Sequence, residues 1–257
     1  CGMGALNHLK VLDLSRILAG PWCGQCLGDL GAEVIKIEHP DGGDDTRKWA
    51  PPYVTQADGS QKDGAYFTAC NRNKRSVVID FSTPEGAALV ARLAEEADIV
   101  IENFKVGGLA KYGLDYDSLK QKNPGLIYCS VTGFGQTGPY AHRAGYDYLI
   151  QAMGGLMSIT GQPDGQAGGG PVKVGVAVSD LFTGMYATVS ILAAIAHRER
   201  TGEGQHIDCA LFDCQTAMLA NQASNWLVGG INPERMGNAH PNVVPYRAYQ
   251  VANGHAI

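Results

Sequence analysis

The sequence predicts an α/β fold built on a mainly parallel β-sheet, and two observations predict it. Apolar runs rich in Val, Ile and Leu, which favour strands, alternate along the 257 residues with segments that favour helices. Several of these runs are apolar at almost every position, and such strands are covered on both faces. This pattern is typical of a parallel sheet, whose strands are joined by helical crossovers.

The first elements form a compact β-α-β unit: strand "LKVLDLS", short helix "WCGQCLGDLGA" and strand "EVIKIE". Polar residues 39–63, rich in Gly, Pro and Asp, predict a long loop. Strand "RSVVIDF" follows. In the next helix, "TPEGAALVARLAEEA", Thr83 is the expected N-cap and Pro84 the first helical residue. Strand "DIVIENF", two short helical pieces and strand "GLIYCSVTGFG" complete this half.

The second half begins with a helix around "YDYLIQAMGGLMS" and a Gly-rich loop. A long helix then runs from Asp180 to about Arg200. It is apolar but carries Thr, Gly and Ser, so we expect it in the protein core and not in a membrane. Strand "QHIDCALF" and helix "DCQTAMLANQASNWLV" follow, and "YQVANGHAI" has the character of a hairpin.

Charge and cysteine content exclude several classes of protein. The net charge of −5, without a dense Lys/Arg stretch, argues against nucleic-acid binding. The seven cysteines, Cys1 among them, are odd in number and lie mostly in apolar contexts, and no signal peptide is evident. We therefore expect reduced thiols and a cytoplasmic protein. Apart from Cys23 and Cys26, no Cys/His spacing suits a metal, so no metal is expected.

The stretch "GPWCGQC" carries Cys23 and Cys26 at the spacing of a redox dithiol. Such a centre needs its nucleophilic cysteine at the start of a long helix, whose dipole lowers the thiol pKa. The helix predicted here is short, which favours two packing thiols, with a thiol oxidoreductase as the alternative. Glu38 ends the second strand as in a dinucleotide-binding unit, but the first turn lacks the G-x-G-x-x-G spacing, so NAD is not indicated.

Two carboxylates stand at predicted helix starts. Asp180 follows "VKVGVAVS", and Asp147 lies beside Tyr146 in "GYDYLIQAMGG". Each can be an N-cap. Alternatively, Asp180 is a nucleophile toward an activated acyl group, with the amides of Gly168–Gly170 approaching the oxyanion.

Seven segments in order resemble the class III CoA-transferases (CaiB/BaiF type) and cover nearly the whole chain. They are "KVLDLSRILAGPWCGQCLGDLGAEVIKIEHPDGGDDTR", "YFTACNRNKRSVVIDFSTPEG", "ADIVIENFKVGGLAKYGLDYDSL", "GYDYLIQAMGGLMSITG", "VGVAVSDLFTGMYA", "RTGEGQHIDCALFD" and "GNAHPNVVPY". The resemblance implies that CoA moves between two acids. Acyl-CoA and a small mono- or dicarboxylic acid are then the substrates, and no cofactor is bound permanently.

The resemblance also implies which residues act. Asp180 matches the family nucleophile, which forms a covalent aspartyl-CoA thioester, and Tyr146 and Asp147 match neighbouring active-site positions. The positions that match CoA contacts are Leu18, Ala19, His39, Ile79, Asp80, Ser82, Asn103, Phe104, Lys111 and Arg143. His39 and Leu18 stand where some members have arginine and glutamine.

A racemase branch of the same superfamily is the nearest alternative. It uses a Gly-His-Asp sequence, and this chain has Tyr146 in place of the histidine. Tyrosine is a poor base near neutral pH, so the transferase is favoured.

The family fold implies a Rossmann-like large domain at residues 1–230 and the start of a linker toward the small domain at 231–257. The small domain itself is expected to be absent from this chain. Two chains of the family interlock as a dimer, and the segment around His240 matches a loop near the active site.

Overall fold

The computed structural model describes residues 4–256, which divide into two compact units. One unit runs up to Gly145 and includes Asp180–Leu211. The second consists of Tyr146–Ser179 and the residues from Phe212 onward. The predicted domain boundary at residue 230 stays a prediction.

A six-stranded sheet organises the first unit. Its strands lie in the order β5-β2-β1-β6-β7-β8, and every neighbouring pair is parallel. The strands are β1 (Lys10–Asp13), β2 (Glu33–Glu38), β5 (Lys74–Val78), β6 (Ile99–Glu102), β7 (Ile127–Thr132) and β8 (His206–Ala210). From β1 the chain adds β2 and then β5 on one side of the sheet. It then returns to the other side of β1, where it adds β6, β7 and β8. Ligands of open α/β sheets bind at the carboxyl ends of the strands beside such a switch point. The predicted α/β fold with a parallel sheet is confirmed.

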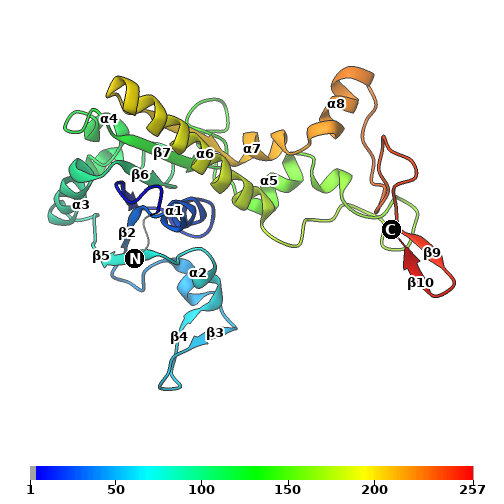
Figure 1. Cartoon of the computed structure of the whole chain (residues 1–257), viewed down its shortest axis with the longest axis horizontal. Helices are drawn as coiled ribbons and strands as arrows, with labels where there is room; N and C mark the ends of the chain where they lie inside the picture. Colours follow the sequence, from blue (N-terminus) through cyan, green and yellow to red (C-terminus); the bar gives the residue numbers. More distant parts are fainter. Residues whose placement is uncertain (1–3, 257) are drawn as a thin grey trace. The chain divides into compact units, whose positions relative to one another are not determined.

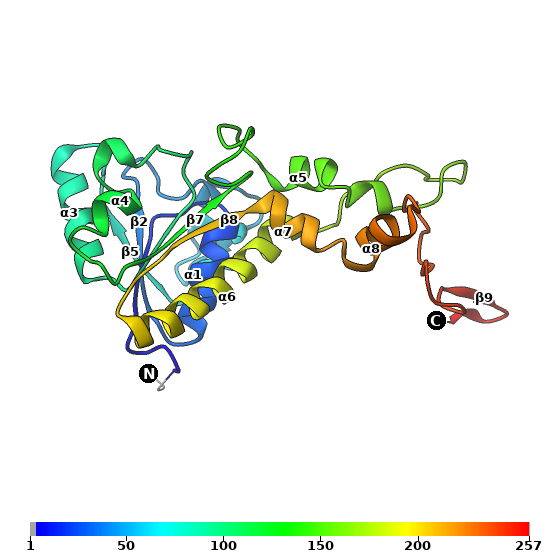
Figure 2. The ribbon, with the colours of Figure 1, turned by 90° about the horizontal axis from the view of Figure 1, so that it is seen from above.

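Helices cover both faces of this sheet, as Figures 1 and 2 show. On one face lie α1 (Ala19–Asp29) and the part of α6 (Val178–Thr201) that belongs to this unit. On the other lie α3 (Pro84–Glu96) and α4 (Tyr116–Leu119). Buried side chains from α3, α4 and the strands form one apolar cluster on this second face. Cys23 and Leu27 of α1 are buried on the first face, so the strands are covered on both. All four residues of β6 are buried.

The predicted start of α3 is confirmed. Thr83 Oγ1 accepts a hydrogen bond from the backbone N of Gly86 at 3.1 Å, and Pro84 occupies the first helical position. Pro84 needs no hydrogen-bond partner there, because the first helical N–H groups have no carbonyl to reach.

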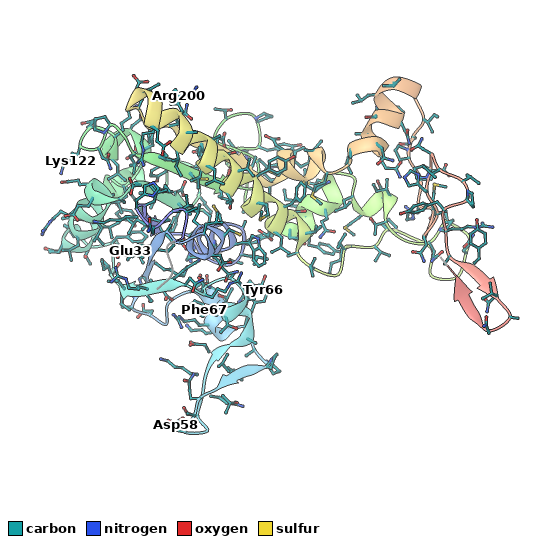
Figure 3. The ribbon with its side chains drawn as sticks, viewed as in Figure 1. Glu33, Asp58, Tyr66, Phe67, Lys122 and Arg200 are labelled. Atoms are coloured by element: carbon teal, nitrogen blue, oxygen red, sulfur yellow. The ribbon has the colours of Figure 1, made fainter. Side chains whose placement is uncertain are left out.

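The prediction of a structureless loop over residues 39–63 is wrong in part. This segment contains the 3-10 helix η1 (Asp45–Lys48) and an antiparallel hairpin of β3 (Tyr53–Thr55) and β4 (Gln61–Gly64), followed by α2 (Ala65–Ala69). Asp58 lies at the hairpin tip, while Tyr66 and Phe67 lie at its base on α2 (Figure 3). Arg47 holds the base together. Its guanidinium pairs with Asp63 at 2.8 Å and lies 3.7 Å from the centre of the Phe67 ring.

The second unit is mainly helical. It contains α5 (Asp147–Met153), η3 (Met157–Ile159), most of α7 (Leu211–Ala217), α8 (Ala220–Gly229) and the hairpin of β9 (Tyr249–Val251) and β10 (Gly254–Ala256). The hairpin confirms the prediction for the last residues described. The single helix predicted over 213–228 is wrong: Ala220 has a φ of +44°, which interrupts the helical path between α7 and α8.

Helix α6 is long and apolar enough to cross a membrane by length and composition alone, and 44% of its apolar window is buried within the protein. Ala187, Ile191 and Ala194 are almost completely buried on one side of the helix. The core helix of a soluble protein meets the same criterion, so this finding leaves the sequence expectation of a core helix in place.

Candidate functional site

A pocket opens at the carboxyl ends of β1 and β2. Its lining residues are Leu14, Arg16, Lys36, Ile37, Glu38, His39, Gly43, Asp44, Phe81 and Phe104. Arg16 and His39 bring basic side chains to the pocket, whereas the Lys36 ammonium is engaged by Asp44 and the Ser15 carbonyl. Phe81 and Phe104 contribute aromatic rings, whose centres are 5.6 Å apart in an edge-to-face arrangement. Basic groups suit phosphates and aromatic rings suit a nucleotide base.

The structure brings several of the predicted CoA contacts to this pocket. His39 and Phe104 line it. Asp80 lies beside His39, with 3.8 Å between Asp80 Oδ1 and His39 Nε2. Ser82 donates its hydroxyl to Asp80 at 2.6 Å, and Ile79 packs against the apolar core of the sheet. Residues 79–82 therefore form one border of the pocket region.

Asn103 acts on the turn between β1 and α1. Its Oδ1 accepts from the backbone N of Arg16 at 2.9 Å, and its Nδ2 donates to the carbonyl of Arg16 at 2.6 Å. Leu18 and Ala19, at the end of this turn, are both buried. Asn103, Leu18 and Ala19 therefore act on a ligand chiefly by fixing the shape of the turn.

Lys111 and Arg143 do not line the pocket. Lys111 lies on η2 (Ala110–Tyr112) with its ammonium 4.7 Å from the centre of the Tyr112 ring. The Arg143 guanidinium lies 4.2 Å from the centre of the Tyr140 ring. Both side chains are on exposed residues, so their role in phosphate binding stays a prediction.

A buried ionic network beneath the pocket was missed at the level of sequence. Lys36 and Glu38 belong to β2, and Asp44 follows in the loop; all three are at most 3% exposed. Burial on its own would raise the pKa of Glu38, but hydrogen bonds from Arg47 and Ser76 outweigh it and lower the pKa to about 2. The signal in the sequence was the charged Lys36 between apolar residues of the strand "EVIKIE".

Asp180 lies in the first turn of α6 and is partly buried. The helix begins at Val178, two residues before it, so Asp180 is inside the helix and is not its N-cap. The positive end of the helix dipole favours a negative charge at this place. The position thus suits an ionised carboxylate that acts as a nucleophile.

Asp147 holds the chain just before Asp180. Its Oδ1 accepts from the backbone N of Ser179, and its Oδ2 accepts from Gln151 Nε2, both at 2.8 Å. Both carboxylate oxygens are thus engaged in positioning contacts, but Asp147 is the first residue of α5 and follows its N-cap, Tyr146, so the prediction that Asp147 caps this helix is wrong. Tyr146 is 64% exposed. Direct roles of Asp147 and Tyr146 in the chemistry stay predictions.

The dithiol hypothesis receives no support from the structure. Cys23 and Cys26 both lie inside α1, beyond its first turn. Burial raises the pKa of the Cys23 thiol to about 12, and burial and Asp29 raise that of Cys26. Thiols with raised pKa values are poor nucleophiles. Cys1 lies outside the described residues.

Across residues 4–256, no group of three or more His, Cys, Asp and Glu side chains is arranged to hold a metal ion.

A family model described as CoA-transferase family III matches residues 6–257. The chain belongs to this family. The resemblance seen in the sequence is thereby confirmed, and with it the α/β large-domain fold that the resemblance implied.

Curated relatives carry CoA-transferase names. The chain is 61% identical to the succinate–glutarate CoA-transferase of Agrobacterium fabrum, over 98% of this chain and 62% of the relative. It is 44% identical to the succinyl-CoA:glutarate CoA-transferase of Homo sapiens, over 98% of this chain and 55% of the relative. It is 45% identical to the succinyl-CoA:mesaconate CoA-transferase of Haloarcula hispanica, over 99% of this chain and 64% of the relative. The chain thus spans less than two thirds of the length of each relative.

Solved structures of the same family are also similar to this chain. A CAIB/BAIF family protein from Brucella suis superposes with a TM-score of 0.91 at 59% identity, over 99% of this chain and 65% of that one. Rv3272 from M. tuberculosis superposes with a TM-score of 0.82 at 33% identity, over 99% of this chain and 65% of that one.

Proposed function

We propose that the full-length protein is an acyl-CoA:carboxylate CoA-transferase that moves CoA from succinyl-CoA to a dicarboxylic acid such as glutarate or mesaconate. Membership of the CoA-transferase family carries the proposal, and the names of the relatives supply the substrates. The pocket at the ends of β1 and β2 supports it, because its basic and aromatic lining suits the phosphates and adenine of CoA.

Asp180 is the proposed nucleophile. Its carboxylate attacks the thioester carbonyl of succinyl-CoA and expels the CoA thiolate, which leaves a mixed anhydride. The thiolate then attacks the aspartyl carbonyl, so that an aspartyl-CoA thioester forms and succinate departs. The acceptor carboxylate attacks this thioester, and the same two steps in reverse release the new acyl-CoA and the free Asp180 carboxylate. The support is a partly buried carboxylate in the first turn of α6, in a segment that matches the family nucleophile.

The test is CoA transfer from succinyl-CoA to a panel of carboxylic acids, with Asp180→Asn as the diagnostic variant. We expect transfer to glutarate or mesaconate and a loss of several orders of magnitude in kcat for the variant. Glu85→Gln is the matched control, because Glu85 is an exposed carboxylate in the first turn of α3. Activity that survives Asp180→Asn, or that falls equally in the control, contradicts the mechanism.

We also propose that the protein is a homodimer, as the family resemblance implies. In support, α6 carries the exposed apolar side chains Phe182, Met185, Tyr186 and Val189 at helical spacing. Light scattering coupled to size-exclusion chromatography tests the proposal: a mass of two chains is expected, and a single-chain mass at micromolar concentration contradicts it.

A further inference from the structure

The turn between β1 and α1 contains a strained residue. Ile17 has a φ of +73°. This left-handed region is open to glycine but is rarely occupied by a β-branched residue. Such conformations persist only where the surrounding structure holds them in place, and they gather at binding sites.

Asp44 holds the backbone N–H of Ile17, while the Cys70 thiol donates to the Ile17 carbonyl at 3.4 Å. The backbone N of Ile17 donates to both carboxylate oxygens of Asp44, at 3.3 Å each. Asp44 Oδ1 also accepts from the backbone N and the hydroxyl of Thr46, at 3.0 and 2.7 Å. One carboxylate therefore ties the turn to the start of η1.

Lys36 fixes this carboxylate from below. Its Nζ lies 2.9 Å from Asp44 Oδ2 and donates to the carbonyl of Ser15 at 2.6 Å. Lys36 and Asp44 are each only 1% exposed, so water cannot replace either partner. Lys36 thus binds the turn directly at Ser15, and it binds the turn at Ile17 through Asp44. We call this pair of contacts the clamp.

The clamped turn borders the pocket. Arg16, Lys36 and Asp44 all line it. Arg16 lies between the two clamped residues, and Asn103 holds its backbone at both the N–H and the carbonyl. The carbonyl of Ser15, both backbone polar groups of Arg16 and the N–H of Ile17 are therefore held by side chains from other parts of the unit.

We propose that the Lys36–Asp44 pair is a positioning device for CoA binding, which keeps Ile17 in the left-handed conformation and so fixes the Ser15–Leu18 edge of the pocket. The inference rests on the proposed function for the identity of the ligand. Asp44 and Lys36 are positioning residues, because their contacts are made to protein groups. The transfer steps do not use them, so their loss raises KM for acyl-CoA and leaves kcat close to its original value.

The experiment is a double-variant cycle in the full-length protein, with the Kd for coenzyme A measured by calorimetry and KM and kcat measured for succinyl-CoA. Asp44→Asn keeps the size of the side chain and removes the charge that pairs with Lys36. We expect it to weaken CoA binding about tenfold. Ile17→Gly needs no clamp, because glycine enters the left-handed region without strain. In the Ile17→Gly background, we expect Asp44→Asn to weaken binding less than threefold.

Asp63→Asn is the control, since Asp63 pairs with Arg47 in the neighbouring part of the network and does not contact the turn. It should leave the Kd unchanged. The proposal is contradicted if Asp44→Asn weakens CoA binding equally in the original and the Ile17→Gly backgrounds. It is also contradicted if Asp44→Asn lowers kcat and leaves KM unchanged. If Asp44→Asn alone fails to fold, recovery of a CoA-binding protein in the double variant supports the proposal, and no recovery contradicts it. Absence of CoA binding by the unmodified protein refutes the proposed function instead.

Discussion

Gly184 sets the distance between the helix that carries Asp180 and the helix that follows the pocket turn. It lies on α6, one turn after Asp180. A Cβ atom at this position would lie 2.7 Å from the carbonyl oxygen of Ala19 and 3.0 Å from Trp22 Cδ1, both on α1. Ordinary contacts of a Cβ begin at 3.4 Å, so Gly184→Ala must displace α6 from α1 by about 0.7 Å, the difference between 3.4 and 2.7 Å.

The displacement is expected to damage catalysis more than stability. Overpacking costs about 1–3 kcal/mol, and replacing a helical glycine by alanine returns about 1 kcal/mol, so the net loss in free energy of unfolding is on the order of 0–2 kcal/mol. A misplacement of about 1 Å at a reacting group can lower the rate about a hundredfold. We therefore expect a loss of roughly ten- to a hundredfold in kcat/KM.

The assays are succinyl-CoA transfer and urea unfolding of the Gly184→Ala variant. Ala193→Ser, which adds one atom to an exposed residue of the same helix, is the control; it should leave kcat/KM unchanged and lower the free energy of unfolding by about 0.5 kcal/mol at most. Unchanged kcat/KM in Gly184→Ala would refute the argument that this close approach positions Asp180.

Three further predictions concern groups elsewhere in the first unit. Burial raises the pKa of Glu102 from 4.5 to about 7. In the unfolded chain Glu102 loses its proton at lower pH than in the folded protein, so the free energy of unfolding should fall by on the order of 3 kcal/mol as pH rises from 4.5 to about 7. Urea unfolding of Glu102→Gln should lack this fall. An unchanged pH profile in the variant contradicts the raised pKa of Glu102. Thr83→Ala removes the hydrogen bond to Gly86 N and should cost about 1 kcal/mol by the same assay; no loss would show that the cap contributes nothing. The double variant Cys23→Ser, Cys26→Ser should keep its transferase activity, and a loss of turnover in a protein that still folds would revive the dithiol hypothesis.

The sheet was predictable because its signals are local. Strands such as "DIVIENF" have an apolar centre, here residues 99–101, and the Thr83-Pro84 pair marks a helix start within two residues. The β3–β4 hairpin was not predictable in this way, since its base depends on Arg47 meeting Asp63 and Phe67 across the fold. Turn residues alone gave no sign of that contact.

In the candidate site, too, local sequence signals predicted some residues, while contacts between distant segments could not be predicted. Asp180 was visible as a carboxylate at a helix start, and the family resemblance gave it a role. The clamp on Ile17 was invisible, because it needs Lys36 from β2 and Asp44 from the following loop to meet beneath the turn. Only the charge inside "EVIKIE" hinted that a buried partner existed.

The central claim is that Asp180 carries the covalent aspartyl-CoA thioester, and one measurement tests it most directly. Full-length protein is incubated with succinyl-CoA alone, treated with hydroxylamine or borohydride, digested, and mapped by mass spectrometry. Hydroxylamine should convert Asp180 to its hydroxamate and borohydride should reduce its carboxyl carbon, in a peptide containing "VSDLFTGM" and only after exposure to succinyl-CoA. Label on another residue, or no label in a protein preparation that transfers CoA from succinyl-CoA to an acceptor acid in a parallel assay, would contradict the claim.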